Sequence, residues 1–374
     1  MVLKKTPMYL DKLSVLNFKN HSDSRLNFNP NINCFVGDNG SGKTNLLDAI
    51  HYLSFTKSFF IKQDSMNVLY DQAFMTIEGV FEKDDKMELV QCAFKTGVKK
   101  VVKRNKKKYD KLADHIGLFP LVMVSPTDIE LLLSGSDVRR KYMDSVISQF
   151  DKEYLNTLIA YNKLILQRNA LLKSSDSDTA YLSNLSLYDE QLSPLAHIIF
   201  DKRQLFLNQL APIFLNYYKA ISNTSEQVTI HYDSQLSKKN FLDLCQQNSE
   251  KDRLVKFTSV GVHKDDLIFH LNGHPIKRVG SQGQQKTYLL ALKLAQFDFM
   301  QEAIGYKPML LLDDVFDKLD DNRVEHLIKL VDKHHFGQIF VTDTHPERSK
   351  QIFNKINADY KLFHIKNGAI EKEE

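Results

Sequence analysis

The chain has 374 residues, of which 43% are hydrophobic and 26% are charged. This composition is typical of a globular protein with room for two or three domains, and it excludes a disordered or fibrous chain. The formal net charge of +4 is a small difference between 50 basic and 46 acidic side chains, so only local clusters of charge indicate a partner.

Cysteine usage and hydropathy bear on where the protein works. Cys34, Cys92 and Cys245 are far apart and odd in number, so they give neither a disulfide framework nor the spacing of a metal site. The N-terminal segment has basic residues but no sustained apolar run, and no stretch approaches the roughly 18 apolar residues of a membrane span. We therefore expect a soluble, cytoplasmic protein with no membrane partner.

The first third of the chain alternates short apolar runs with turns, which predicts the strands of a sheet. The runs lie at residues 10–18, 32–36, 74–81 and 89–94.

A phosphate-binding motif follows the second of these predicted strands. The segment 37–44 matches GxxxxGK[ST] and precedes a predicted helix at 45–53, which is the context that the motif requires. Its glycines let backbone N–H groups surround a β-phosphate at the start of the helix. Lys43 would reach the β- and γ-phosphates, and the Thr44 hydroxyl would coordinate Mg²⁺. The predicted ATP-binding residues are Gly37, Asp38, Asn39, Gly40, Ser41, Gly42, Lys43 and Thr44.

A basic cluster follows, in which nine of the residues from 95 to 111 are Lys or Arg, around a turn at Asn105-Lys106. A hairpin with this charge could neutralise several DNA phosphates, and a solvated hairpin tip is an equally good interpretation. Because no aromatic ladder interleaves the cluster, the contact expected is sequence-neutral and made to the backbone. The candidate DNA-binding residues are Lys103, Arg104, Lys106, Lys107 and Lys108.

From Arg139 to about Ile221 the pattern becomes helical, with Leu158, Ile165 and Leu172 at heptad spacing. A second apolar stripe runs through Leu192, Leu195, Ile199, Phe206 and Leu210. Such stripes indicate core packing between successive helices more often than a partner site. Strand-like runs return from Val228 onwards.

A second helix start lies at residues 281–284. Ser281 and Gln284 have the spacing of a capping box, which defines the helix N-terminus sharply and points its free N–H groups at something anionic. A capped helix without any ligand is the alternative.

An apolar strand at 308–312 then ends in two carboxylates, in the form of a Walker B strand. The first, Asp313, would hold Mg²⁺ together with Thr44, and Asp314 lies where a general base could orient water toward the γ-phosphate. Asp313 and Asp314 are the predicted catalytic residues. A strand capped by two solvated acids is the alternative.

The spacing of these motifs resembles that of the ABC ATPases. Lys43 and Asp313 are separated by most of the chain, which is far more than small kinases or GTPases use. The segment Ser281, Gln282, Gly283 and Gln284 resembles the ABC signature loop, which binds the γ-phosphate of the other subunit's nucleotide. Asp317 and Asp320 resemble the D-loop that touches across the same interface. This resemblance implies that the ATP site lies in a homodimer interface.

The ATPase motifs flank the helical region, so we expect an α/β fold in which one ABC-type P-loop ATPase domain is built from both chain ends, with an α-helical arm inserted. The predicted domains are an N-terminal lobe at 1–125, a helical arm insertion at 126–227 and a C-terminal lobe at 228–374.

Further motifs resemble the RecF family in order and spacing, over about residues 10–345. They are Leu13-Ser-Val-Leu-Asn-Phe-Lys-Asn-His-Ser, the P-loop with Asn45-Leu-Leu-Asp-Ala-Ile, Ser125-Pro-Thr-Asp-Ile-Glu, Arg139-Arg-Lys-Tyr-Met-Asp144, Gly261-Val-His-Lys-Asp-Asp266, Ser281-Gln-Gly-Gln-Gln-Lys-Thr and Leu311-Leu-Asp-Asp-Val-Phe-Asp-Lys-Leu-Asp. The resemblance implies an SMC-like head domain with a short helical arm. It also implies a protein that binds ATP, dimerises around it, binds duplex or gapped DNA and, with RecO and RecR, helps to load RecA at single-strand gaps.

Two positions depart from the SMC-like pattern. Those relatives carry a glutamine after the first lobe, and Asp128 is the substitute that this segment offers. They end a late strand with a switch histidine, whereas here His345 is displaced by two positions. With the shorter Asp314 as base, we expect weak ATP hydrolysis that works as a switch.

Three other functions use the same motifs. They are an ATPase subunit of a membrane transporter, an architectural ATP-gated clamp without useful hydrolysis, and a small-molecule P-loop kinase. A kinase predicts no ATP-driven dimer, and the signature helix argues against it.

Overall fold

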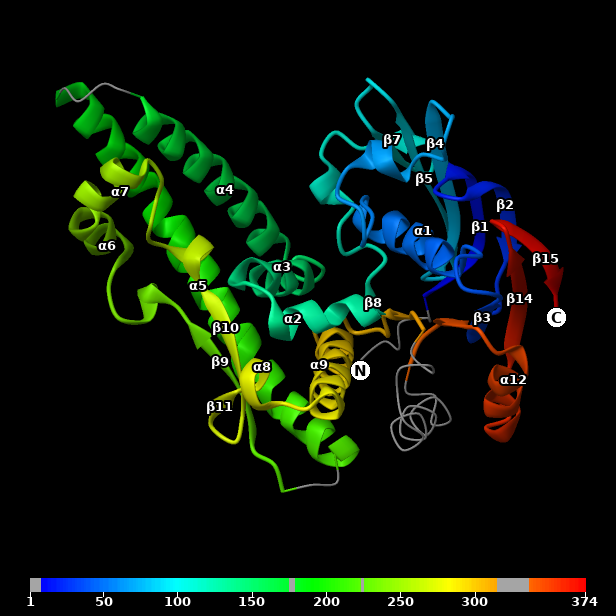
Figure 1. Ribbon diagram of the computed structural model, residues 1–374. Coiled ribbons are helices and arrows are strands. Elements are labelled where there is room, and N and C mark those ends of the chain that lie inside the picture. Colours follow the sequence, from blue (N-terminus) through cyan, green and yellow to red (C-terminus); the bar gives the residue numbers. More distant parts are fainter. Residues whose placement is uncertain (1–7, 175–178, 223–224, 315–335) are drawn as a thin grey trace. The chain divides into compact units, whose positions relative to one another are not determined.

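The structure is a computed structural model that describes residues 8–174, 179–222, 225–314 and 336–374. Its internal contacts divide the chain into two compact units. Unit 1 comprises Met1–Asp128 and Lys286–Glu374, so both ends of the chain build it, and unit 2 comprises Ile129–Gln285. Figure 1 follows the chain through both units in colour.

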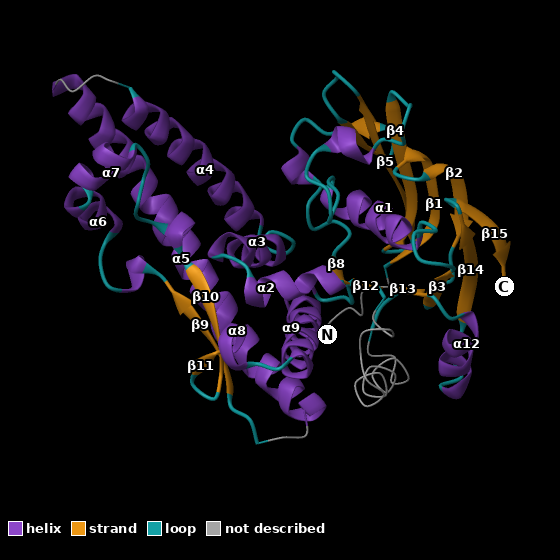
Figure 2. Ribbon diagram, in the orientation of Figure 1, coloured by secondary structure: helices purple, strands orange, loops and turns teal. Residues whose placement is uncertain are grey.

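Unit 1 contains two six-stranded sheets, drawn as orange arrows in Figure 2. The first has the order β2-β1-β4-β5-β6-β7 and is antiparallel throughout. Its strands are β1 (Tyr9–Phe18), β2 (His21–Asn27), β4 (Phe74–Lys83), β5 (Lys86–Lys95), β6 (Val101–Arg104) and β7 (Lys107–Lys108). Burial alternates along much of β1 and β4, as expected for strands with one face in the core.

The second sheet has the order β15-β14-β3-β13-β12-β8, and all of its pairs are parallel except β14 with β15. Its strands are β3 (Ile32–Val36), β8 (Leu121–Val124), β12 (Met309–Leu312), β13 (Ile339–Asp343), β14 (Tyr360–Lys366) and β15 (Ala369–Glu373). Every residue of β3, β12 and β13 is buried, which is typical of central parallel strands covered on both faces.

Helix α1 (Lys43–Phe55) lies between these two sheets, in contact with β1, β4 and β5 of the first and with β8 and β13 of the second (Figure 1). Its side chains Leu46, Leu47, Ile50 and Leu53 are fully buried in the core that the sheets share. The start of α1 is therefore held rigidly against the parallel sheet. Two further helices lie in the described residues of this part of the chain: α9 (Gln282–Ile304), whose first turn belongs to unit 2, and α12 (Pro346–Lys355).

Unit 2 is built on two long helices that pack side by side, α4 and α5 (Figure 1). The other elements are short. Its helices are α2 (Glu130–Leu133), α3 (Ser136–Ile147), α4 (Lys152–Lys173), α5 (Thr179–Ser222), α6 (Phe241–Gln247), α7 (Ser249–Val255) and α8 (Ile276–Val279), and its strands are β9 (Val228–Asp233), β10 (Asp266–Leu271) and β11 (His274–Pro275). None of the helices in the described ranges has the length and hydropathy that a bilayer-spanning segment needs.

The apolar stripes predicted from the sequence lie in this helix pair. Ile165 and Leu172 of α4, and Ile199 and Phe206 of α5, are buried. The boundary of the insertion differs from the predicted one, because unit 2 continues to Gln285 instead of ending at residue 227. The difference arises because β9 packs on α5 and pairs with β10, so the small sheet belongs with the arm.

Candidate functional site

Four parallel strands bring the predicted nucleotide-binding residues to one edge of the second sheet. Neighbours β3, β13, β12 and β8 run in the same direction, so their carboxyl ends lie together. The segments that leave these ends are the 37–44 loop, residues 342–345, residues 313–314 and residues 125–128. Binding sites of open α/β sheets lie at this edge.

The 37–44 loop turns sharply between β3 and α1 with positive φ angles at Gly37 (151°), Gly40 (80°) and Gly42 (117°). A side chain at Gly37 would meet the Ile365 carbonyl oxygen at 2.2 Å, so this position requires glycine. Lys43 is buried, and its Nζ donates to the carbonyl oxygens of Gly37 at 2.7 Å and Asp38 at 3.0 Å. The lysine is thus folded across the loop, where an incoming phosphate could take over its hydrogen bonds.

The loop is held from behind by residues that the sequence motif does not contain. Asn20 Nδ2 donates to the Ser41 carbonyl oxygen at 3.1 Å, and Gly368 N donates to the same oxygen at 2.7 Å. His21 is fully buried with Nε2 3.0 Å from the Gly42 carbonyl oxygen, and burial lowers the pKa of this imidazole. A neutral His21 therefore donates this hydrogen bond from Nε2. Asn20 and His21 lie in the 13–22 motif that resembles RecF, and this motif is the sequence signal that could have identified them.

The central contact of the site joins the two halves of the motif set. Thr44 Oγ1 donates to Asp313 Oδ1 at 2.7 Å, across 269 positions of sequence. Asp313 also accepts from Thr342 Oγ1 at 3.1 Å and from Ser125 Oγ at 3.4 Å. Burial raises the pKa of this carboxyl, the negative Asp314 raises it further, and the hydrogen bond from Thr44 acts in the opposite direction. A desolvated carboxylate beside a hydroxyl favours the arrival of a cation.

Hard oxygen donors of this kind fit Mg²⁺, which binds through one or two protein ligands and takes the rest from phosphates and water. No cluster of three or more His, Cys, Asp or Glu side chains that could hold a metal by themselves occurs in the described residues. Ser41 Oγ is buried and has no hydrogen-bond partner among the described residues, which leaves a donor available beside the loop. The donor set therefore fits a nucleotide with its magnesium ion.

Asp314 follows directly and has a left-handed backbone, with φ of 46°. Its N–H donates to Thr342 Oγ1 at 2.8 Å, and Thr342 Oγ1 lies 3.2 Å from Asp314 Oδ1. Asp314 is half-buried, and its carboxylate is therefore accessible from solvent. Asp317 and Asp320, the predicted D-loop residues, lie outside the described residues.

Asp128 is engaged locally. Its Oδ1 forms an ion pair with Lys293 Nζ at 2.7 Å, and its Oδ2 accepts from Ser125 N at 2.8 Å. Lys293 also donates to the Met123 carbonyl oxygen. Within this segment it is Ser125 that reaches Asp313.

His345 is exposed at the start of α12, and its backbone N–H donates to Asp343 Oδ1 at 3.0 Å. Asp343 is fully buried and accepts from Arg348 and from Ser349 Oγ. The residues after β13 thus organise the start of α12.

The predicted signature loop lies in unit 2 and forms the capping box expected from its sequence. Gln284 N donates to Ser281 Oγ at 3.2 Å, and Ser281 N donates to Gln284 Oε1 at 2.7 Å. Gln284 Nε2 also donates to Glu226 Oε1 at 2.7 Å, so both polar atoms of the Gln284 side chain have partners within the unit. Ser281 and Gln282 are exposed, and Gly283 is half-buried.

The basic cluster forms the predicted hairpin, with Asn105 (φ 50°) and Lys106 (φ 68°) as the turn between β6 and β7. Arg104 makes a bidentate ion pair with Glu88, with Nε 2.8 Å from Oε2. Lys100 is 2.8 Å from Asp64 Oδ2. The seven remaining cations of the cluster are exposed, and they are Lys95, Lys99, Lys103, Lys106, Lys107, Lys108 and Lys111.

The chain is similar over nearly its whole length to known proteins. A family model described as the RecF/RecN/SMC N terminal domain matches residues 9–371. The DNA replication and repair protein RecF of Flavobacterium johnsoniae is 49% identical over 364 residues, covering 96% of this chain and 100% of that protein. RecF of Bacteroides fragilis is 48% identical over 368 residues, covering 98% and 99%.

Solved structures show the same fold. The recombination mediator protein RecF with ATP, of the RecFOR pathway, has a TM-score of 0.89 at 30% identity and covers 100% of this chain and 99% of its own. The Smc head domain of Pyrococcus furiosus has a TM-score of 0.57 at 14% identity and covers 98% and 96%. The prediction of an ABC-type, SMC-like P-loop fold with a helical arm is confirmed. The matches favour a DNA repair protein over a transporter subunit.

Proposed function

Because the chain belongs to the RecF family of DNA replication and repair proteins, we propose that it binds ATP at the 37–44 loop, dimerises around the nucleotide and binds DNA in that state. By family resemblance, RecO and RecR are its partners, and loading of RecA at single-strand gaps is its outcome.

The contact between Thr44 Oγ1 and Asp313 Oδ1, at 2.7 Å, carries this proposal. It places the hydroxyl of the phosphate loop against the acidic end of β12, which is the arrangement that P-loop ATPases use for the metal–phosphate complex. Thr44 and Asp313 would hold Mg²⁺, and the ion would neutralise charge on the phosphates.

The other residues act on the nucleotide directly. Lys43 would exchange the carbonyl oxygens of Gly37 and Asp38 for phosphate oxygens, which are stronger acceptors for an ammonium group. The loop N–H groups and the start of α1 would cradle the anion. Asp314 is half-buried beside Asp313 and would accept a proton from the attacking water.

Ser281 would close the site from a second copy of the chain. Its loop is exposed, lies at the N-terminus of a 23-residue helix and has its cap geometry already formed. Helix N-termini favour anions, so a γ-phosphate on another copy is a suitable ligand. Gln284 contributes to the shape of the loop, since its amide is used within the unit.

The hairpin of unit 1 supplies a surface for the DNA backbone. Lys103, Lys106, Lys107 and Lys108 are exposed, whereas Arg104 is tied to Glu88. Four lysines within six positions suit phosphates of any sequence.

Analytical ultracentrifugation tests the proposal most directly. With ATP and Mg²⁺ the protein should sediment as a dimer, and gapped DNA should join that dimer. Without nucleotide the dimer should be weaker. A chain that binds ATP but stays monomeric at all concentrations would support a single-copy ATP site instead.

A further inference from the structure

A short apolar segment of unit 2 is exposed at the end of α7. Leu254, Val255 and Phe257 are 83%, 39% and 44% exposed. Lys256 between them has a left-handed backbone with φ of 57°, which ends the helix. Exposed apolar side chains that are scattered singly are ordinary, whereas these three lie within four positions of one another. We call Arg253 to Phe257, which are the last three residues of α7 and the two that follow, the 253–257 loop.

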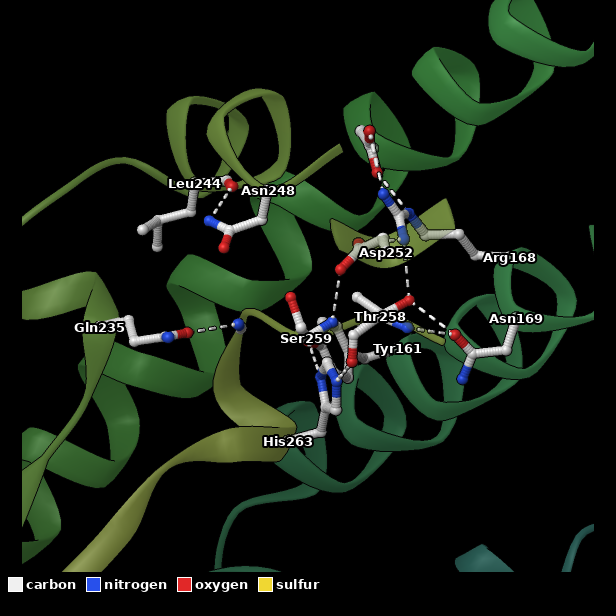
Figure 3. A network of polar contacts seen from close by, with 12 residues as sticks. Tyr161, Arg168, Asn169, Gln235, Leu244, Asn248, Asp252, Thr258, Ser259 and His263 are labelled. Carbon is white, nitrogen blue, oxygen red and sulfur yellow. Dashed lines mark hydrogen bonds and ion pairs between the residues drawn. The ribbon is translucent and has the colours of Figure 1, made fainter. Parts of the chain in front are cut away.

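The two ends of the 253–257 loop are held by a buried polar network, which Figure 3 shows from close by. Asp252 accepts from Arg168 Nη1 at 2.8 Å and from Ser259 N at 2.9 Å. Thr258 accepts from the same Arg168 nitrogen at 3.0 Å, and its N–H donates to Asn169 Oδ1 at 2.7 Å. Both ends are thereby fixed to α4. A ligand of this loop would lose little binding energy in ordering it.

Cations surround the exposed apolar side chains. Lys251, Arg253 and Lys256 are exposed, and none of them has an ion pair with a residue that the structure describes. Lys264 Nζ lies 4.8 Å from the centroid of the Phe257 ring, and Phe257 is 44% exposed. The surface therefore combines an aromatic ring with several positive charges.

The charges beside the loop are not balanced. Burial lowers the pKa of Lys264, and the positive charges of Arg140 and Lys251 lower it further. Of the two acids on α7, Asp252 is buried and already paired with Arg168, which leaves Glu250 as the one exposed carboxylate among Lys251, Arg253 and Lys256. A cluster of cations that repel one another is stabilised when an anion arrives.

The chemistry favours single-stranded nucleic acid over the other anionic partners. A duplex turns its phosphates outward and stacks its bases inside, so it would leave the apolar side chains without contacts. A single strand offers phosphates and unstacked bases together. A standard protein interface takes about 20 residues or more on each partner, whereas this surface consists of Arg253 to Phe257 with Lys251 and Lys264.

We propose that the 253–257 loop, with Lys251 and Lys264, is a contact site for single-stranded DNA, with the exposed Phe257 side chain stacking on a base. This inference rests on the proposed function and names the form of DNA that unit 2 takes.

The test uses the absence of tryptophan from the chain. The Phe257→Trp variant then carries a single tryptophan, whose fluorescence reports stacking at this position. Without nucleotide, an unlabelled oligothymidylate should quench the tryptophan fluorescence at low salt, and the quenching should disappear as the salt concentration rises. A duplex of equal length should quench it much less.

A paired affinity measurement keeps the test independent of fluorescence. By anisotropy with labelled oligothymidylate, Lys256→Ala/Phe257→Ala should weaken binding about tenfold, since it removes a stacking face and a phosphate contact. The control Lys163→Ala/Leu166→Ala removes an exposed lysine and a leucine that is 71% exposed on α4 of the same unit. It should bind as the wild type does.

The inference is overturned if oligothymidylate leaves the tryptophan unquenched, or if the two double variants bind it equally. Quenching by purified RecR or RecO, with none by oligothymidylate, would also overturn it and assign the loop to a protein partner. Failure of the proposed function gives a different result. The protein would then form no ATP-dependent dimer, while the tryptophan fluorescence would still respond to oligothymidylate.

Discussion

Replacing Ser281 with arginine tests whether two copies of the chain share the ATP site. The side chain of Ser281 is exposed, and its two capping hydrogen bonds lie within its own unit. Loss of the Oγ acceptor should cost about 1 kcal/mol of stability, or a few degrees in Tm, as for other helix caps. The unit should therefore stay folded. The 37–44 loop keeps every contact that holds it, so ATP binding should remain.

Dimerisation should fail in the same variant, because a bulky cation would occupy the place of a small hydroxyl facing the partner's γ-phosphate. Sedimentation with ATP and Mg²⁺ measures this. Asn240→Ala is a matched control, since Asn240 Oδ1 caps α6 through Leu242 N at 3.0 Å in the same unit. It should lose similar stability and still dimerise. If Ser281→Arg dimerises with the concentration dependence of the wild type, the shared-site reasoning is refuted.

Other perturbations test the remaining residues. Lys43→Ala should abolish tight ATP binding with an unchanged circular dichroism spectrum, because among the described residues Lys43 Nζ bonds only to carbonyl oxygens of the loop. Normal ATP binding by calorimetry would show that the ATP site is assigned wrongly. Asp314→Asn should bind ATP but not release phosphate, because an amide cannot take a proton; unchanged turnover would remove it as the base. Alanine at all three lysines of 106–108 should weaken DNA binding equally for all sequences and lower the log–log salt slope by roughly one unit per lost contact, whereas an unaltered slope would mark a solvated tip. Burial lowers the pKa of His51 and His263 to about 4, so the unfolded chain binds more protons below about pH 6.5 and stability should fall as the pH drops from there to about 4. Urea unfolding across that range measures it, and a flat profile would contradict it.

The sequence predicts the parts of the site that depend on local geometry. The phosphate loop needs glycines at the positions where φ is positive, and the capping box needs Ser281 and Gln284 three residues apart. Strand β12 is a continuous apolar run, as a central parallel strand must be. The extent of the arm could not be predicted in the same way. The strand-like runs that begin at Val228 look like those of the ATPase lobes, and only the packing of this region on α5 assigns it to unit 2.

Residues that act through long-range contacts also escape sequence reasoning. Asn20, in the turn between β1 and β2, and His21, the first residue of β2, hold the phosphate loop across 21 positions of sequence. Arg139 shows the same difficulty. Its guanidinium pairs with Asp266 at 2.6 Å, which joins two family motifs separated by 127 positions into one ion pair.

Strand order explains why Thr342 belongs to the candidate site. Because β13 lies between β3 and β12, the end of β13 is beside both the phosphate loop and the two acidic residues. The Thr342 hydroxyl accepts from Asp314 N and has a single proton, for which Asp313 at 3.1 Å and Asp314 at 3.2 Å compete. One carboxylate therefore lacks this donor at any moment, and Asp313 keeps its hydrogen bond from Thr44 when the Thr342 proton is donated to Asp314. Thr342 thus joins the end of β13 to both acidic residues, while the backbone N–H of His345, two residues later, donates to Asp343 at the start of α12.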